Sequence, residues 1–181
     1  MYINMLYVHS VFVFIFSVLY SVLEIEIEGK DGGWAKNIPT IPSGLGILTN
    51  YHVIMNIIII FVVSYSTYIL FQDIYIIIYY NILWFVIEDF CWFVLNPYFT
   101  LERYTKEDIW WHSDQMWIYN IPLHNIVSFS ILALIIFISQ NIHLFYNLVF
   151  ISILTFIVIE NSHFYHKWYL KTHNNKNDIK K

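Results

Sequence analysis

Long apolar stretches without charged residues are the feature that most restricts the folds open to this chain. A helix that crosses a bilayer needs about 20 mostly apolar residues, and five segments of the sequence approach or reach that length. Only 12% of the residues are charged, whereas a soluble domain carries about 25%. The sequence therefore predicts an integral membrane protein. The predicted spans are Met5–Leu23, Val53–Gln72, Ile74–Leu95, Ile121–Ser139 and Leu144–Ile159. The fifth is short for a span, and the helical-looking sequence after Glu160 is expected to continue it.

Composition and charge exclude several other classes of protein. The net charge is −4 and no basic stripe is present, which argues against nucleic-acid binding. The hydrophobic fraction of 59% excludes intrinsic disorder, and a disulfide scaffold is excluded because Cys91 is the only cysteine. The first span lacks the basic start and the small-residue cleavage site of a signal peptide. We therefore expect the lipid bilayer as the main partner, with other membrane proteins or a second copy of the chain as further partners.

The basic residues fall on one side of the membrane if the chain crosses it five times. Segments 24–52 and 96–120 and the chain after the fifth span then share that side, whereas a count of four spans would divide the basic residues between both sides. The positive-inside rule places this side in the cytosol, or its equivalent, and the N-terminus outside. The basic residues are Lys30, Lys36, Arg103, Lys106, Lys167, Lys171, Lys176, Lys180 and Lys181.

Tryptophans and prolines mark the ends of the predicted spans. Asn96-Pro97 is expected to end the third helix, and Asn120 is expected to cap the fourth, with Pro122 in its first turn. We predict an all-α bundle of five transmembrane helices with two interfacial loops on the cytosolic side. Residues 1–170 form a single transmembrane domain, and residues 171–181 form a basic polar tail. An aromatic belt at the cytosolic face is predicted from Trp34, Trp92, Trp110, Trp111, Trp117 and Trp168.

Glu88 and Asp89 are the most informative polar residues, because they lie within the third span. They are roughly 10 Å from its cytosolic end, and ionisable residues at such depth are costly and often functional. Trp84 and Trp92 share a helix face with Glu88, and we expect this face to turn inward. Asp89 lies about 100° away around the helix, where it can reach a second partner. Two interpretations stay open: a functional site, or structural carboxylates that pair with basic or hydrogen-bonding side chains.

Histidines are the second group of candidate functional residues. His52 begins the second span, His112 lies in the tryptophan-rich loop, and His124 lies in the first turn of the fourth helix. Under the five-span map, all three lie at the same face as the two buried carboxylates, so they can converge. The predicted catalytic residues are Glu88, Asp89, His52, His112 and His124.

A divalent metal ion is one predicted cofactor, since carboxylates and imidazoles are typical ligands of zinc and iron. General acid–base chemistry without a metal is the alternative. The spacing Glu160-x-x-His163-x-x-His166 is not specific, because residues i and i+3 share a helix face whereas i+6 turns away. The candidate metal ligands are Glu88, His112, Glu160 and His163.

The first loop begins with an acidic segment. Glu24, Glu26 and Glu28 alternate with isoleucines, which predicts an extended edge or a frayed helix end. The glycines that follow permit a tight turn. The loop is too short and too acidic to bind phosphate.

Several short motifs occur together between about residues 20 and 125. They are Glu26-x-Glu28-Gly29 with Gly33-Trp34-Ala35-Lys36-Asn37-Ile38-Pro39-Thr40, Tyr51-His52, Glu88-Asp89-Phe90-x-Trp92-Phe93-x-x-Asn96-Pro97, and Ile109-Trp110-Trp111-His112 with Pro122-Leu123. In these motifs the chain resembles a group of uncharacterised small multi-span membrane proteins from microbial genomes. The chain departs from the group's pattern at Ile38, where leucine is common, and at Asn50, where the group has glycine. The resemblance implies a membrane location and no known activity.

The leading functional hypothesis is a site of carboxylates and histidines at the cytosolic interface that processes a lipid or another membrane substrate. The alternative is a non-enzymatic structural subunit or scaffold of a membrane complex, which the absence of any motif with established ligand spacing favours. A transporter is the least favoured class, because the spans show no repeat and only the third carries charges well inside.

Overall fold

The computed structural model describes residues 2–30, 40–42, 47–108, 116–119 and 121–178. Its main elements are five α-helices: α1 (Tyr2–Glu28), α2 (Asn50–Phe71), α3 (Ile74–Leu95), α4 (Leu123–Ser139) and α5 (Ile142–Asp178). All except α4 are long and apolar enough to cross a membrane. With 17 residues, α4 is about 26 Å long, slightly less than a hydrocarbon core of about 30 Å. The predicted all-α bundle is confirmed.

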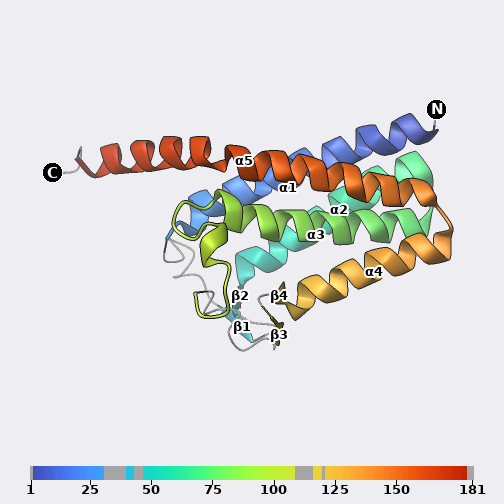
Figure 1. Cartoon of the computed structure of the whole chain (residues 1–181), viewed down its shortest axis with the longest axis horizontal. Helices are drawn as coiled ribbons and strands as arrows, with labels where there is room; N and C mark the ends of the chain where they lie inside the picture. The colour runs from blue at the N-terminus through green and yellow to red at the C-terminus, as the bar shows by residue number, and fades with distance from the viewer. Residues whose placement is uncertain (1, 31–39, 43–46, 109–115, 120, 179–181) are drawn as a thin grey trace.

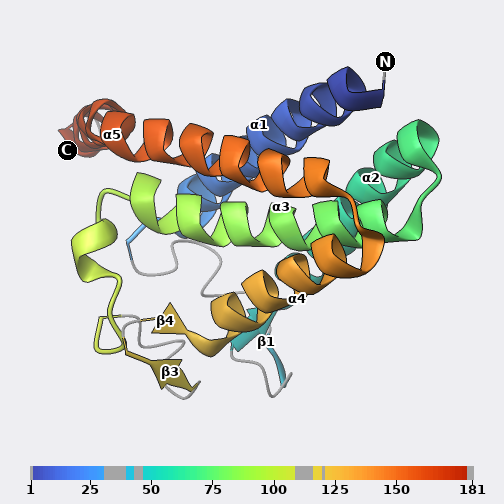
Figure 2. The ribbon, with the colours of Figure 1, turned by 45° about the vertical axis from the view of Figure 1, so that its right-hand side comes forward.

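The helices alternate in direction, so the short and long connections lie at opposite ends of the bundle (Figure 1). The turns at residues 72–73 and 140–141 lie at the same end as the N-terminus. The other end, which we call the loop end, contains the C-terminus, the ends of α1 and α3, and the starts of α2 and α4 (Figure 2). This is the arrangement that five spans predict. The assignment of the loop end to the cytosolic side remains a prediction that rests on the positive-inside rule.

The two tight turns are built from a left-handed residue followed by a new helix. Gln72 and Gln140 have φ angles of 51° and 52°, and each ends its helix and reverses the chain. Asp73 then caps α3, because its side chain accepts hydrogen bonds from the backbone N–H groups of Tyr75 and Ile76. Two residues, Gln72 and the capping Asp73, therefore separate α2 from α3, and the chain reverses there to form a tight helical hairpin.

Short strands and a 3₁₀ turn complete the loop end. Strand β1 (Thr40–Pro42) pairs antiparallel with β2 (Ile47–Thr49), and β3 (Trp117–Ile118) pairs antiparallel with β4 (Ile121–Pro122). The 3₁₀ turn η2 covers Leu101–Arg103. None of these strand pairings is predicted from the sequence. Because Pro122 belongs to β4 and keeps an extended backbone, the expectation that it lies inside the first turn of the fourth helix is wrong.

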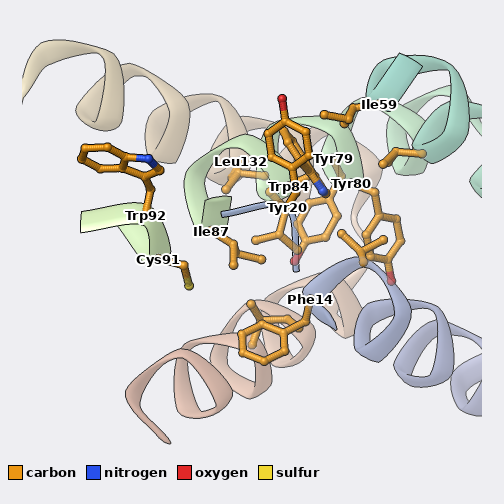
Figure 3. Close-up of a cluster of buried hydrophobic side chains, with 14 of the residues drawn as sticks. Phe14, Tyr20, Ile59, Tyr79, Tyr80, Trp84, Ile87, Cys91, Trp92 and Leu132 are labelled. Carbon is orange, nitrogen blue, oxygen red and sulfur yellow. The ribbon is translucent and has the colours of Figure 1, made fainter. Parts of the chain in front are cut away.

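Helix α3 is the centre of the bundle and packs against each of the other four helices. Its buried aromatic side chains, Tyr79, Tyr80 and Trp84, form the middle of the core (Figure 3). Trp84 and Trp92 are both buried, so the prediction that their helix face turns inward is confirmed. The outward faces of the helices carry exposed isoleucine, leucine and phenylalanine, which is the surface expected against lipid.

The first and last helices extend beyond the predicted spans, and for the last helix this continuation was expected. The acidic segment expected in the first loop is the last turn of α1, which ends at Glu28. The expectation of an extended edge is therefore wrong, and the alternative of a helix end holds. Gly29 has a φ of 56° and its N–H bonds to the carbonyl of Ile25 at 2.8 Å. Similarly, α5 continues past Ile159 to Asp178, because neither glycine nor proline interrupts the chain there.

Candidate functional site

A seam of small polar side chains brings α1 against α3. Ser17 and Ser21 are fully buried, and their hydroxyls donate to carbonyls of α3: Ser17 to Trp84 at 3.4 Å and Ser21 to Glu88 at 2.9 Å. Small residues of this kind let two membrane helices approach closely. The next residue on this stripe of α1 is Glu24, so the seam places its carboxyl beside that of Glu88.

The carboxyls of Glu24 and Glu88, which we call the acid pair, interact across the seam. Glu24 is only 9% exposed. The Oε1 atom of Glu88 is buried and has no hydrogen-bond partner among the described residues. Two negative charges at close range repel each other, so such a pair is suited to share one proton. The sequence analysis selected Glu88 but missed Glu24.

His52 also has a partner that the sequence analysis missed. Its Nε2 atom lies 3.0 Å from Oε1 of Glu28, one turn beyond Glu24 on α1. The Tyr51 hydroxyl donates to the same carboxylate oxygen and lies 3.1 Å from the imidazole. We call these three residues the Glu28–Tyr51–His52 cluster. His52 is near Glu24 as well, so this cluster borders the acid pair.

Tyr20 points into the same region. Its side chain is 5% exposed, and its hydroxyl lies against the carboxyls of Glu24 and Glu88. The Tyr20 ring packs edge-on against Trp84, with 5.2 Å between ring centroids. The buried indole N–H of Trp84 lacks a partner within the described part of the chain, and a buried polar atom of this kind is costly.

Buried polar side chains at the opposite end of the bundle are joined in a hydrogen-bonded network. His9 is buried, and its Nε2 lies 2.8 Å from the hydroxyl of Thr67. The hydroxyls of Ser10 and Tyr80 are 2.8 Å apart, and Asn147 donates to Ser10. This network, the tied end, links α1, α2, α3 and α5. The buried polar side chains of this network are therefore hydrogen-bonded to one another.

Asp89 faces a different neighbour from Glu88. Its Oδ2 lies 3.4 Å from Nε2 of His124 on α4, in agreement with the predicted offset around α3. Tyr104 lies beside this pair and accepts a hydrogen bond from Asn125 at 2.7 Å. Burial raises the pKa of the Tyr104 hydroxyl above its usual range, and the negative charge of Asp89 raises it further. The predicted catalytic residues thus divide between the α1 side and the α4 side of α3.

The predicted metal ligands do not assemble among the described residues. Glu160 and His163 lie on an exposed face of α5, where the Nδ1 atom of His163 is 3.0 Å from the Glu160 carbonyl of its own helix. His112 lies outside the described residues. In residues 2–30, 40–42, 47–108, 116–119 and 121–178, no three His, Cys, Asp or Glu side chains could hold a metal ion together. The donor set that the structure describes therefore does not fit the predicted ion.

Comparisons with known proteins add no relative. No protein-family model matches the chain, and neither the curated proteins nor the solved structures contain a match. The chemistry of the site follows from its geometry: two carboxyls that can share a proton, beside an imidazole held by a third carboxylate. This arrangement is suited to general acid–base chemistry.

Proposed function

We propose that the protein is an integral membrane enzyme that transfers protons to or from a substrate dissolved in the bilayer. The observation that carries the proposal is the acid pair. Buried carboxylates with a purely structural role are usually paired with a cation or with neutral hydrogen-bond donors, whereas the Glu88 carboxyl faces a second acid, Glu24, and its Oε1 atom has no hydrogen-bond partner in the described chain. Ionisable residues at membrane depth are functional candidates for the same reason.

The neighbouring groups support a division of roles. Glu88 would donate or accept the proton, and Glu24 would hold it between turnovers. The side chains of His52 and Glu28 are 21% and 18% exposed, so they lie between the buried pair and the surface. An imidazole exchanges protons readily near neutral pH. The Glu28–Tyr51–His52 cluster would therefore exchange protons between the acid pair and water at the loop end.

Reconstitution with membrane lipids tests this function. Wild-type protein and the variants Glu24→Gln and Glu88→Gln would be placed in vesicles made from a total lipid extract, and every lipid species would be followed by mass spectrometry. Glu107→Gln is the matched control, since Glu107 is exposed and outside the site. We expect wild type and the control to change the same lipid species and both site variants to lose that change.

The alternative, a structural subunit, predicts a different result. Wild type would then leave all lipids unchanged and would purify in a fixed ratio with other membrane proteins. Equal lipid conversion by wild type, Glu24→Gln and Glu88→Gln would also contradict the proposal. Elution of each variant as a single species in mild detergent would show that lost conversion does not reflect misfolding.

A further inference from the structure

A hollow of about 240 Å³ lies at the loop end, where α5 runs past the end of α3 (Figure 1). It has room for a group of several heavy atoms, because one water molecule takes about 30 Å³ of the liquid. The described residues that border it include no member of the acid pair or of the Glu28–Tyr51–His52 cluster, so it is a separate site. Its lining contains Val94, Thr100, Glu102, Ile159, Ser162 and His166.

Two polar side chains of this lining direct their hydrogens to backbone carbonyls. The Nε2 atom of His166 lies 2.9 Å from the carbonyl oxygen of Val94, which can only accept, so Nε2 carries the hydrogen and Nδ1 of the neutral ring keeps a lone pair. The Ser162 hydroxyl donates to the carbonyl of Ile159 at 2.8 Å, and its oxygen also keeps lone pairs. Both side chains therefore offer acceptors, and not donors, to a group in the hollow.

Glu102 adds a negative charge to these acceptors. Its side chain is exposed, and it forms no ion pair within the ranges that the structure describes. The neighbouring Arg103 is bonded to Asp108 at 3.0 Å instead. An anionic group would therefore meet repulsion in the hollow, whereas a cation with N–H donors would find a carboxylate and two neutral acceptors.

The kind of cation follows from the same lining. A primary ammonium group has three N–H donors, which match the Glu102 carboxylate, Nδ1 of His166 and the Ser162 oxygen. A quaternary ammonium group has no N–H, and proteins recognise it with aromatic faces. Among the described residues that border the hollow, none is a tryptophan, tyrosine or phenylalanine. The lining thus fits a primary ammonium group and not a quaternary one.

The hollow lies at the level expected for lipid headgroups. A hydrocarbon core of about 30 Å corresponds to about 20 helical residues. Counted from the starts of α3 at Ile74 and α5 at Ile142, the core ends near Val94 and Ser162, which both line the hollow. Phe156, deeper in the core on α5, is exposed, so acyl chains can lie along this helix below the hollow.

Thr100 supplies a further observation at the same place. Its backbone has φ 57° and ψ 166°, a region that is essentially restricted to glycine, and a β-branched residue is strained there. Such strain clusters at active sites and ligand clamps. The strained residue and the acceptor-lined wall therefore coincide.

We propose that this hollow binds the primary ammonium group of a phosphatidylethanolamine lipid in the leaflet at the loop end. Glu102 supplies the opposite charge, and Nδ1 of His166 and the Ser162 oxygen accept from the ammonium N–H groups. The proposal goes beyond the acid–base function and does not depend on it.

Native mass spectrometry of the protein released from detergent micelles measures this binding directly. The protein would be titrated with dioleoylphosphatidylethanolamine or with dioleoylphosphatidylcholine, which has the same chains and net charge but no N–H in its headgroup. Free ethanolamine, added in competition, distinguishes a lipid from a soluble amine. We expect about ten-fold tighter binding of the ethanolamine lipid than of the choline lipid, and no displacement by an equal concentration of free ethanolamine.

The variant Glu102→Gln removes the charge and keeps the size of an exposed side chain, so the fold should be retained. It should weaken binding of the ethanolamine lipid about ten-fold, because a hydrogen bond to a charged group is lost. Glu107→Gln is the matched control, since Glu107 is also exposed in the same segment and does not line the hollow. It should leave binding unchanged.

Three results would overturn the proposal. Equal affinity for the two lipids would contradict the assignment of a primary ammonium group. Unchanged binding in Glu102→Gln, or equal weakening in Glu107→Gln, would contradict the assignment of the hollow. Displacement by an equal concentration of free ethanolamine would show that the ligand is a soluble amine. Because no lipid is converted in this measurement, its failure leaves the proposed acid–base function untouched.

Discussion

The hydrogen bond between Ser10 and Asn147 at the tied end should contribute measurably to the stability of the bundle. Asn147 is fully buried on α5, donates to the Ser10 hydroxyl of α1, and accepts from the Tyr79 hydroxyl of α3 at 3.2 Å. Replacing Asn147 by leucine keeps a side chain of similar volume and removes both bonds. The variants Ser10→Ala and Asn147→Leu, made singly and together, form a double-mutant cycle.

The expected loss of stability in Asn147→Leu follows from the hydrogen bonds that its two former partners, Tyr79 and Ser10, keep. Tyr79 still donates to the carbonyl of Leu144 at 3.0 Å, and Ser10 still donates to the carbonyl of Leu6. Neither Tyr79 nor Ser10 is therefore left without a hydrogen bond, so the free energy of unfolding should fall only by the contribution of the two lost hydrogen bonds. Hydrogen bonds between membrane helices contribute about 0.6 kcal/mol each. Asn147→Leu should therefore lower the free energy of unfolding by about 1.2 kcal/mol, and the coupling to Ser10→Ala should be about 0.6 kcal/mol.

Unfolding in mixed micelles with increasing dodecyl sulfate, followed by circular dichroism, measures these energies. Ser152→Ala is the matched control, because the Ser152 hydroxyl is exposed and bonds only within its own helix, and it should change the free energy of unfolding by less than either site variant. A coupling energy of zero between Ser10→Ala and Asn147→Leu would refute the assignment of this bond. A cost for Asn147→Leu well above 2 kcal/mol would refute the argument that every partner keeps a second bond.

Three further predictions concern the loop end and the seam. Gly29→Ala should lower the free energy of unfolding by about 1 kcal/mol, because Gly29 has a φ of 56° and only glycine adopts that conformation without strain; the same denaturation assay measures it. Ser21→Val should push α1 away from α3 and lower the free energy of unfolding by about 1–3 kcal/mol. It should also change how fast dicyclohexylcarbodiimide, which modifies protonated carboxyl groups in apolar surroundings, labels the acid pair; unchanged labelling would contradict the role of the seam. Single cysteines at positions 30 and 106 of a cysteine-free variant should react with an impermeant reagent from one face of a vesicle, and a cysteine at position 73 from the other; labelling of positions 30 and 106 from opposite faces would contradict the five-span arrangement.

The helices could be predicted from the sequence because their signals are local. The third span was predicted as Ile74–Leu95, the bounds that the structure has, since Asp73 caps its start and Asn96-Pro97 ends it. The end of α1 was not predicted, because the alternation of glutamate and isoleucine resembles a strand pattern. Backbone hydrogen bonding nevertheless continued to Gly29, where the first residue suited to a left-handed conformation stands.

The site could be predicted only in part, because contacts between helices depend on how each helix is rotated. Glu88 and His52 were selected from depth and residue type, whereas their partners Glu24 and Glu28 were missed. A signal for Glu24 was present: Ser17 lies seven residues before it, and this spacing keeps residues on one face of a membrane helix pair. Nothing in the sequence placed Asn147 beside Ser10.

The length of α5 has a consequence for what the protein can meet outside the bilayer. A helix of 37 residues is about 55 Å long, so about 25 Å of it exceeds a hydrocarbon core of about 30 Å. The excess projects beyond the loop end (Figure 1), where His173 pairs with Glu26 at 3.1 Å. In a bilayer that surrounds the other helices, this excess would lie beyond the hydrocarbon core, and the exposed side chains of Lys167 and Lys171 would be accessible to soluble molecules that cannot enter the membrane.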